Sequence, residues 1–298
     1  MKRIVLLLVV CFFPMSLGAA QANELNFELK AGGAGYVVIK GKYDSMRTVV
    51  IPAIHMGKPV VAIGPYAFAG FSRIKSITIP DSVTSIGEAA FWKCTGLEDI
   101  RIPDGVTSIQ DGVFKECTSL REIVLPRSVT SIGWGAFSDC YQLKNIVLHN
   151  SITNIGESAF DCCFSFKEIT IPKSVTSIGA RVFFGCKRLE EITLPDSVTS
   201  IGVEAFLGCR QLKNIVLPQS ITNIGETAFG GCDRLEEITI PDGVSSIKDK
   251  TFKNCHKLDE ILIPDSVTSI GIEAFFGCHE LENIVLPKNL KSIGKEAF

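Results

Sequence analysis

Nine cysteines recur at a step of 23 residues, and their thiols are the most reactive side chains that this chain repeats. They are Cys94, Cys117, Cys140, Cys163, Cys186, Cys209, Cys232, Cys255 and Cys278. Each follows a phenylalanine by three residues, which places the two on one inward face where a small apolar thiol packs well. Stacked thiols would also point the same way, which strains a disulfide. We therefore predict structural, mostly reduced cysteines, with Cys162, outside the column, as the most reactive thiol.

Zinc binding is the alternative chemistry for two of these cysteines. The pairs Cys255-His256 and Cys278-His279 put two thiols and two imidazoles on adjacent repeats, and zinc binds these residue types. Neighbours in an extended segment point to opposite sides, so the four side chains should not converge. We predict no metal site and no cofactor.

Catalytic motifs are absent from the sequence. It contains no Gly-x-Ser-x-Gly, no His-Glu-x-x-His and no glycine-rich phosphate loop. A Ser-Val-Thr-Ser-Ile segment recurs in most repeats, and its hydroxyls are expected to satisfy turn backbone. Acidic pairs such as Glu190-Glu191 and Glu236-Glu237 also recur, as a solvated face would. We predict no catalytic residues and no enzymatic activity.

These residues belong to a 23-residue unit that repeats from residue 51 to the end. The same step separates eleven isoleucines, the first at 63 and the last at 293, and eleven phenylalanines from 68 to 298. In the unit 189–209, residues 192–194 alternate inward and outward as a short strand, and Pro195 ends it. Residues 198–201 form a second β-prone piece, Gly202 permits a tight bend, and residues 204–207 suit a short helical or 3₁₀ turn.

A coil of this kind cannot bury its apolar residues alone. Stacked coils pair their strands in parallel and turn each recurring residue into a core column. The sequence therefore predicts a β-rich repeat solenoid of the α/β type, with about ten coils between residues 51 and 298.

The repeat pattern Leu-x-x-Ile-x-Leu-Pro-x-x-Val-x-x-Ile-Gly-x-x-Ala-Phe-x-x-Cys resembles the BspA-like, treponemal-type leucine-rich repeat. The resemblance extends from about residue 48 to residue 298. It implies a right-handed solenoid with a parallel sheet on its concave face. It also implies a bacterial surface or secreted protein, some of whose relatives bind host matrix proteins or other cells.

The two ends of the chain depart from the repeat. Residues 1–22 have a basic start, an apolar run of ten residues and an Ala-Gln-Ala cleavage pattern, which predict a signal peptide and export. The run is too short to span a membrane. Residues 23–50 contain two β-prone runs around glycines, which predict a hairpin cap. The chain stops at Phe298 in mid-coil, so we expect either a fragment or an open edge that permits self-association.

Charge argues against one class of partner. The chain of 298 residues carries 30 Lys and Arg against 32 Asp and Glu, a net charge of −2. Loss of Lys2 and Arg3 with the signal peptide lowers this to −4. Nucleic-acid binders usually have a basic excess, so we predict no nucleic-acid partner.

The outward strand positions are the candidate protein-binding site. One stripe is largely β-branched: Thr78, Arg101, Val124, Val147, Thr170, Thr193, Val216, Thr239, Leu262 and Val285. Two residues earlier runs an acidic and amide stripe with Asp99, Glu122, Glu168, Glu191, Glu237 and Glu260, together with Ser76, Asn145, Asn214 and Asn283. This surface suits an extended or basic protein partner. The competing interpretation is that these residues are simply good strand formers.

Together these observations predict a cell-surface or secreted, adhesin-like module that binds a host matrix protein or another cell. Periplasmic residence stays open as an alternative location. The alternative function is a structural or self-assembling element of the cell envelope without a dedicated ligand.

Overall fold

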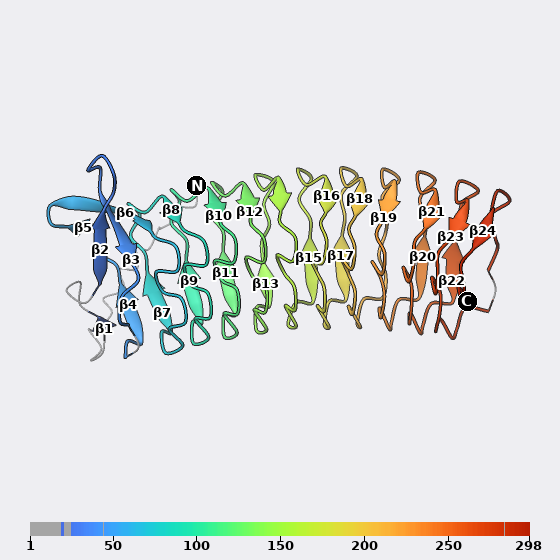
Figure 1. Cartoon of the computed structure of the whole chain (residues 1–298), viewed down its shortest axis with the longest axis horizontal. Coiled ribbons are helices and arrows are strands. Elements are labelled where there is room, and N and C mark those ends of the chain that lie inside the picture. The colour runs from blue at the N-terminus through green and yellow to red at the C-terminus, as the bar shows by residue number, and fades with distance from the viewer. Residues whose placement is uncertain (1–18, 21–24, 44, 283) are drawn as a thin grey trace, which may run out of the picture.

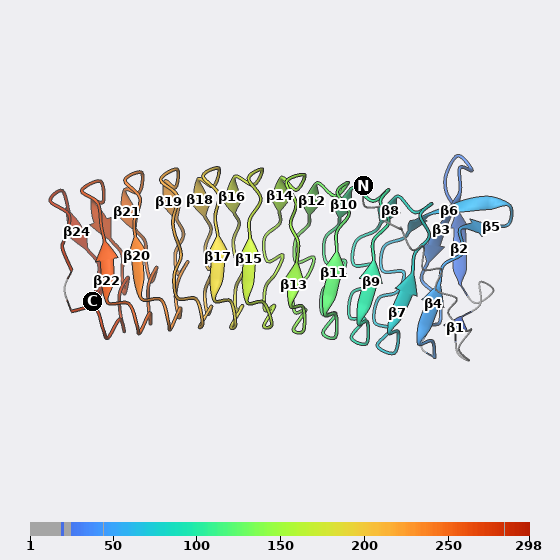
Figure 2. The same cartoon turned by 180° about the vertical axis from the view of Figure 1, so that it is seen from behind.

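A computed structural model describes residues 19–20, 25–43, 45–282 and 284–298. Apart from residues 19 and 20, the predicted signal peptide lies outside these residues. The described chain is a β-solenoid of about eleven turns with coils of about 23 residues. The coils stand side by side along the long axis, in sequence order from blue to red (Figures 1 and 2). The fold predicted from the repeat is therefore confirmed.

One side of the coils carries short parallel strands, which we call the first sheet side. Its strands are β1 (Ala19–Ala20), β4 (Thr48–Val50), β7 (Ser76–Thr78), β9 (Asp99–Arg101), β11 (Glu122–Val124), β13 (Asn145–Ile146), β15 (Glu168–Thr170), β17 (Glu191–Thr193), β20 (Glu237–Thr239) and β22 (Glu260–Leu262). Between β17 and β20, isolated bridges through Asn214 continue the pairing.

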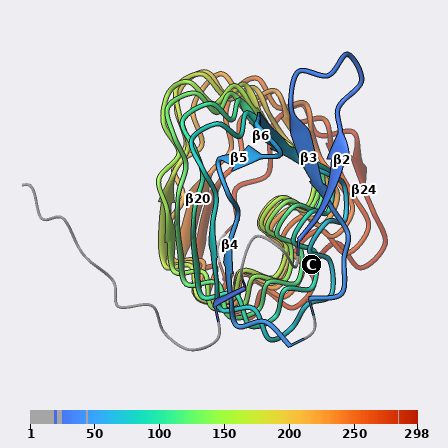
Figure 3. The ribbon, with the colours of Figure 1, turned by 90° about the vertical axis from the view of Figure 1, so that its left-hand side faces the viewer.

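A second row of parallel strands follows the bend of each coil. It comprises β6 (Lys58–Ile63), β8 (Ser85–Ile86), β10 (Ser108–Ile109), β12 (Ser131–Ile132), β14 (Asn154–Ile155), β16 (Ser177–Ile178), β18 (Ser200–Ile201), β19 (Asn223–Ile224), β21 (Ser246–Ile247), β23 (Ser269–Ile270) and β24 (Ser292–Ile293). Seen end-on, the coils superpose, with β4 and β20 along one side and β24 away from them (Figure 3).

The strands before the first regular coils form a separate arrangement. β2 (Asn26–Leu29) and β3 (Tyr36–Ile39) make an antiparallel hairpin, and β3 pairs in parallel with β6. β5 (Ile54–His55) folds back antiparallel on β6. The His55 ring stacks on Phe27 at 4.0 Å between centroids, so this loop is tied to the hairpin.

Strand register explains why the sequence repeats so strictly. Ile100 pairs with Ile123 and Ile178 with Ile201, each 23 residues away, so equivalent residues stack rung on rung. The buried phenylalanines form a continuous column in which neighbouring rings lie nearly parallel, for example Phe206 and Phe229 at 5.4 Å and 7°. A core made of identical rungs admits the same side chain at each level.

The third side of the coil is a run of turns, not the short helix expected at residues 204–207. Among the described residues no helix forms. Glu204 has a φ of 55°, outside the helical region. Every second N–H group of this run donates to the next coil. The Phe206 N–H donates to the Ala228 carbonyl of the next coil at 2.8 Å, whereas the Leu207 N–H donates to the Glu204 carbonyl within its own turn at 3.2 Å. Bonding between coils thus replaces the helical pattern.

The bend glycine is required by close approach of backbones. A Cβ added at Gly225 would lie 2.4 Å from the backbone carbon of Gly202 in the preceding coil. Neither glycine has a positive φ, so conformational freedom alone does not explain the position. In the described part of the chain, no helix has the length and apolarity needed to cross a membrane.

Candidate functional site

The ten outward positions of the β-branched stripe lie on the first sheet side, and we call this surface the strand face. All ten are exposed. Along each strand, exposed residues alternate with buried core residues. In β17, for example, Glu191 and Thr193 face outward and Ile192 is buried. The valines stand out because 82 % of Val216, 80 % of Val285 and 74 % of Val124 are exposed.

Parallel pairing brings the two predicted stripes into ordered columns on the strand face. Glu168 stands beside Glu191, and Thr170 beside Thr193. Asp99 stands beside Glu122 and Arg101 beside Val124, and Glu237 stands beside Glu260. Like charges placed opposite one another on neighbouring strands are destabilising. The carboxylates stand side by side, and Lys144, Lys167 and Arg188 line the same hollow as Glu168 and Glu191.

Arg101 interrupts this pattern and is held in place. Its guanidinium Nη1 lies 2.8 Å from Asp81 Oδ1 in the preceding coil. The hydrogen bond and charge of Asp81 raise the pKa of the Arg101 guanidinium. Both side chains are well exposed, so the ion pair adds little stability. The ion pair does offset the positive charge of Arg101, the basic residue in the largely β-branched stripe.

Three shallow hollows involve the strand face, and the one of about 520 Å³ contains Asn145, Glu168 and Glu191 beside basic residues. One of about 480 Å³ is lined by Asn145, Val147, Glu168 and Thr193 among others. The third, of about 500 Å³, extends over β9 and β11 and includes Arg101. The second and third combine carboxylate or amide groups with aliphatic side chains, which is the composition predicted for the surface.

The cysteine column lies in the core, as its inward position predicts. Each ladder thiol from Cys94 to Cys278 donates a hydrogen bond to the carbonyl of a phenylalanine 26 residues earlier, for example Cys209 Sγ to Phe183 O at 3.1 Å. Burial raises the pKa of Cys94 to about 12 and that of Cys278 to about 11. All ten cysteines of the described residues are free thiols. These thiols are neutral donors that link one coil to another.

Cys162, predicted as the most reactive thiol, is one of two described cysteines that are not fully buried. It is half-buried, and its pKa is raised to about 12, first by desolvation and then by the hydrogen bond and charge of Asp161. Nucleophilic cysteines need the thiolate, which these surroundings disfavour.

The four possible zinc ligands do not converge. Cys255 Sγ points inward and donates to the Phe229 carbonyl at 3.1 Å, whereas His256 and His279 are exposed and stack on each other at 5.4 Å. Within the described residues, no group of three or more His, Cys, Asp or Glu could hold a metal ion.

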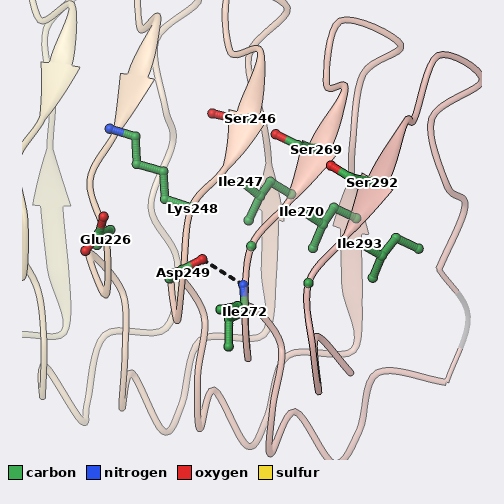
Figure 4. A pocket seen from close by; sticks show the side chains of 12 residues that line it. Glu226, Ser246, Ile247, Lys248, Asp249, Ser269, Ile270, Ile272, Ser292 and Ile293 are labelled. Atoms are coloured by element: carbon green, nitrogen blue, oxygen red, sulfur yellow. Dashed lines mark hydrogen bonds between the residues drawn. The ribbon is translucent and has the colours of Figure 1, made fainter.

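The first serine and the threonine of the recurring segment bond to backbone, as predicted, whereas the second serine, in the coils that the structure describes, does not. Ser197 Oγ donates to the Val175 carbonyl at 2.7 Å, and equivalent serines in other coils do the same. Figure 4 shows a second hydroxyl row, Ser246, Ser269 and Ser292, beside a hollow of about 450 Å³. Asp249 in this hollow accepts a hydrogen bond from the Ile272 N–H at 2.7 Å rather than from a serine. Asp249 therefore supports the backbone of the next coil and not a serine hydroxyl.

A cluster of exposed aromatic residues on the turn side was missed by the sequence analysis. Tyr66, Trp92 and Trp134 come from three coils and line one small cavity, which we call the aromatic pocket. They occupy different positions of the repeat, at −2, +1 and −3 from the core phenylalanines 68, 91 and 137. A search for recurring columns cannot find such a cluster. Deviations from the repeat, aligned coil by coil, would have pointed to it.

Comparison with known proteins gives one consistent result. Six copies of the BspA type leucine rich repeat region match residues 45–163 and 176–298. A leucine-rich repeat protein of T. pallidum is 35 % identical, with 66 % of this chain and 91 % of that chain covered and a TM-score of 0.62. A leucine-rich repeat protein from Bacteroides ovatus is 28 % identical, with coverage of 92 % and 90 % and a TM-score of 0.62. No curated protein matches the chain.

Proposed function

The chain belongs to the BspA-type leucine-rich repeat family, and from this we propose that it is a non-enzymatic, exported, adhesin-like module that binds proteins through its strand face. Leucine-rich repeat solenoids are protein-interaction modules, which gives the general class of function. The proposed partners are host matrix proteins or proteins on another cell. The proposed location is the cell surface or the surrounding medium.

One observation carries the choice of surface. On the strand face, exposed aliphatic side chains such as Val124, Val147 and Val216 share one row with threonines, and the neighbouring row holds carboxylates and amides. Exposed aliphatic groups that lie together, with polar groups at their side, are typical of interaction sites. Burial of Val147 and Val216 under a partner would remove their apolar surface from water.

The chemistry of this face indicates what the partner presents. Carboxylates of Glu168 and Glu191 lie in register and accept charge-assisted hydrogen bonds. A partner segment with Lys or Arg beside aliphatic residues complements both stripes. Electrostatic complementarity of this kind raises the association rate and fixes the orientation of the partner.

A binding screen with the full chain tests the proposal. Immobilised matrix proteins and partner cells are probed with the native protein and with the double variant Glu168→Lys, Glu191→Lys. We expect a saturable partner whose binding weakens about tenfold or more in the double variant, and weakens further as salt rises. Absence of any binding by the native protein would count against the proposal.

A matched control keeps the change in net charge and moves it off the strand face. Glu157 and Glu226 are exposed on the turn side, so the variant Glu157→Lys, Glu226→Lys has the same total charge as the test variant. Binding that weakens equally in both variants would show a general charge effect and would remove the strand face from the proposal.

The structural alternative predicts a different behaviour. The same exposed valines would then pack against a second copy of the chain. Light scattering over a concentration series separates the two functions, because a self-assembling element forms oligomers as its concentration rises. A monomer at all concentrations would leave the binding module as the function.

A further inference from the structure

We propose that the aromatic pocket is a second binding site, on the turn side, that takes one ring of a neutral carbohydrate. Its cavity has a volume of about 180 Å³. This is smaller than the ~300–1,000 Å³ of sites for drug-sized molecules, and it suits a single sugar ring. The lining residues are Tyr66, Glu88, Ala89, Trp92, Asp111, Gly112, Lys115 and Trp134.

Three aromatic rings form the apolar part of the pocket. The rings of Tyr66 and Trp92 lie edge to face, with centroids 6.4 Å apart and planes at 77°. Exposed fractions are 41 % for Tyr66 and 49 % for Trp134, and Trp92 is half-buried. None of the three is needed in the core, where the column of Phe68 and Phe91 fills the same coils. Packing therefore does not explain why they gather.

Two of the aromatic side chains, and the backbone of Trp134, are held by polar partners. The Tyr66 hydroxyl lies 3.0 Å from Glu88 Oε1, and the indole Nε1 of Trp92 donates to Glu116 Oε1 at 3.1 Å. Asp111 Oδ1 accepts the backbone N–H of Trp134 at 2.7 Å. A site whose groups are already oriented loses less conformational entropy when it binds a ligand.

Acceptors and a donor remain available for hydroxyl groups. Within the part of the chain that the structure describes, the second carboxylate oxygens of Glu88 and Asp111 make no hydrogen bond. Lys115 Nζ lies 4.7 Å from the centroid of the Trp134 ring and supplies a donor at the rim. The pocket thus combines flat apolar surfaces with both kinds of hydrogen-bonding group.

This combination matches a sugar better than other ligands. A pyranose ring has an apolar C–H face for an aromatic ring and hydroxyls that both donate and accept. A quaternary ammonium would meet the positive charges of Lys93 and Lys115, whose Nζ atoms lie 4.7 Å from the indole centroids, whereas a neutral sugar is not repelled by them. An anionic ligand would meet the carboxylates of Glu88 and Asp111.

Tryptophan fluorescence tests the proposal directly. The chain has two tryptophans, and both line this pocket, so their emission reports this site. The full chain is titrated with neutral trisaccharides that end in glucose, galactose, mannose or N-acetylglucosamine, and separately with choline. We expect a saturable change of emission with at least one trisaccharide and none with choline. No response to any trisaccharide, or a response to choline alone, would overturn the proposal.

Variants then assign the signal to the pocket. Trp134 is exposed, so Trp134→Ala should fold, and we expect binding to weaken about tenfold, measured by calorimetry because one reporter is lost. Phe276→Ala is the matched control, since Phe276 is an aromatic residue 42 % exposed on the turn side and outside the pocket. Equal losses in both variants would contradict the assignment.

The test is independent of the protein-binding proposal. Glu168→Lys, Glu191→Lys changes the strand face and should leave the sugar response unchanged. Trp134→Ala should leave protein binding unchanged. Failure of one proposal therefore leaves the other standing.

Discussion

On the inward side of the coils the same residue returns at each rung, whereas the outward positions change from one coil to the next. The inward phenylalanine and cysteine columns run from Phe68 to Phe275 and from Cys94 to Cys278. On the turn side, the position of Trp92 is taken by Lys115 one coil later and by Ser138 in the coil after that. A stacked core requires a side chain of the same size and shape at each level, whereas a side chain that faces solvent is not restricted in this way.

In a repeat protein, this contrast separates two kinds of functional surface. A property shared by most coils, such as the carboxylate column, acts over a length of surface. A property that occurs once, such as the aromatic pocket, marks a single site. The strand face is a surface of the first kind and the aromatic pocket is a site of the second kind. Changes on the inside of the coils should therefore affect stability, and changes on the outside should affect binding.

The largest effect is expected from alkaline pH, which acts on the whole column of inward thiols. Burial raises the pKa of the ladder cysteines in the folded state, to about 12 for Cys94 and about 11 for Cys278, above the value near 9 of a free thiol. Protonated thiols are therefore favoured by folding, and their contribution is complete below pH 9 and is lost as the pH rises from 9 towards 11 and 12. Each buried thiol should lower the unfolding free energy by about 1.4 kcal/mol per pH unit in that range.

Urea unfolding at a series of pH values from 7 to 11 measures this loss. Replacement of Cys186, Cys209 and Cys232 by alanine should make the decline shallower, because three of the titrating groups are gone. An equal slope in this triple variant and the native protein would contradict the role of the column.

The next effect concerns the phenylalanine column. Phe206 is fully buried between Phe183 and Phe229, at 5.6 and 5.4 Å between ring centroids. Phe206→Ala should cost about 3–5 kcal/mol. Val216→Ala, on the outside of a neighbouring coil, should cost less than about 0.5 kcal/mol. Hydrogen exchange of the central coils measures both, and similar losses would remove the distinction between inside and outside.

A smaller effect is expected from single thiols. Cys209→Ala removes one hydrogen bond to the Phe183 carbonyl and some packing, at about 1–2 kcal/mol. Phe183 O keeps the bond from the Cys186 N–H at 3.2 Å, so the loss stays moderate. Cys162→Ala is the comparison, because Cys162 is half-buried and outside the column, and it should cost less. Chemical denaturation at pH 7 ranks the two variants.

The smallest effect on stability is expected at the aromatic pocket. Trp134→Ala should change the unfolding free energy by less than about 1 kcal/mol, because about half of the side chain is exposed. A large loss of stability would mean that this residue belongs to the framework of the fold, and that its exposure does not mark a binding site.

Much of the fold follows from the sequence because stacking gives each residue a single environment. The 23-residue step, the buried residues Ile192, Phe206 and Cys209, and the exposed positions Glu191 and Thr193 all followed from one aligned unit. The parallel register of β15 and β17 follows from the same 23-residue step, because each residue of β15 pairs with the residue 23 positions later in β17. The candidate strand face could be placed for the same reason, although its ligand stays a prediction.

Other features depended on contacts between coils that no single unit contains. The turn run around Glu204 is not helical because half of its N–H groups bond to the next coil. Cys162 lies next to the column in sequence, yet desolvation and Asp161 suppress its thiolate. The sequence by itself determined which residues face the core, since burial follows the period. Only the tertiary structure decided that Tyr66, Trp92 and Trp134 meet, because stacking brings residues of different repeat positions to one place on the surface.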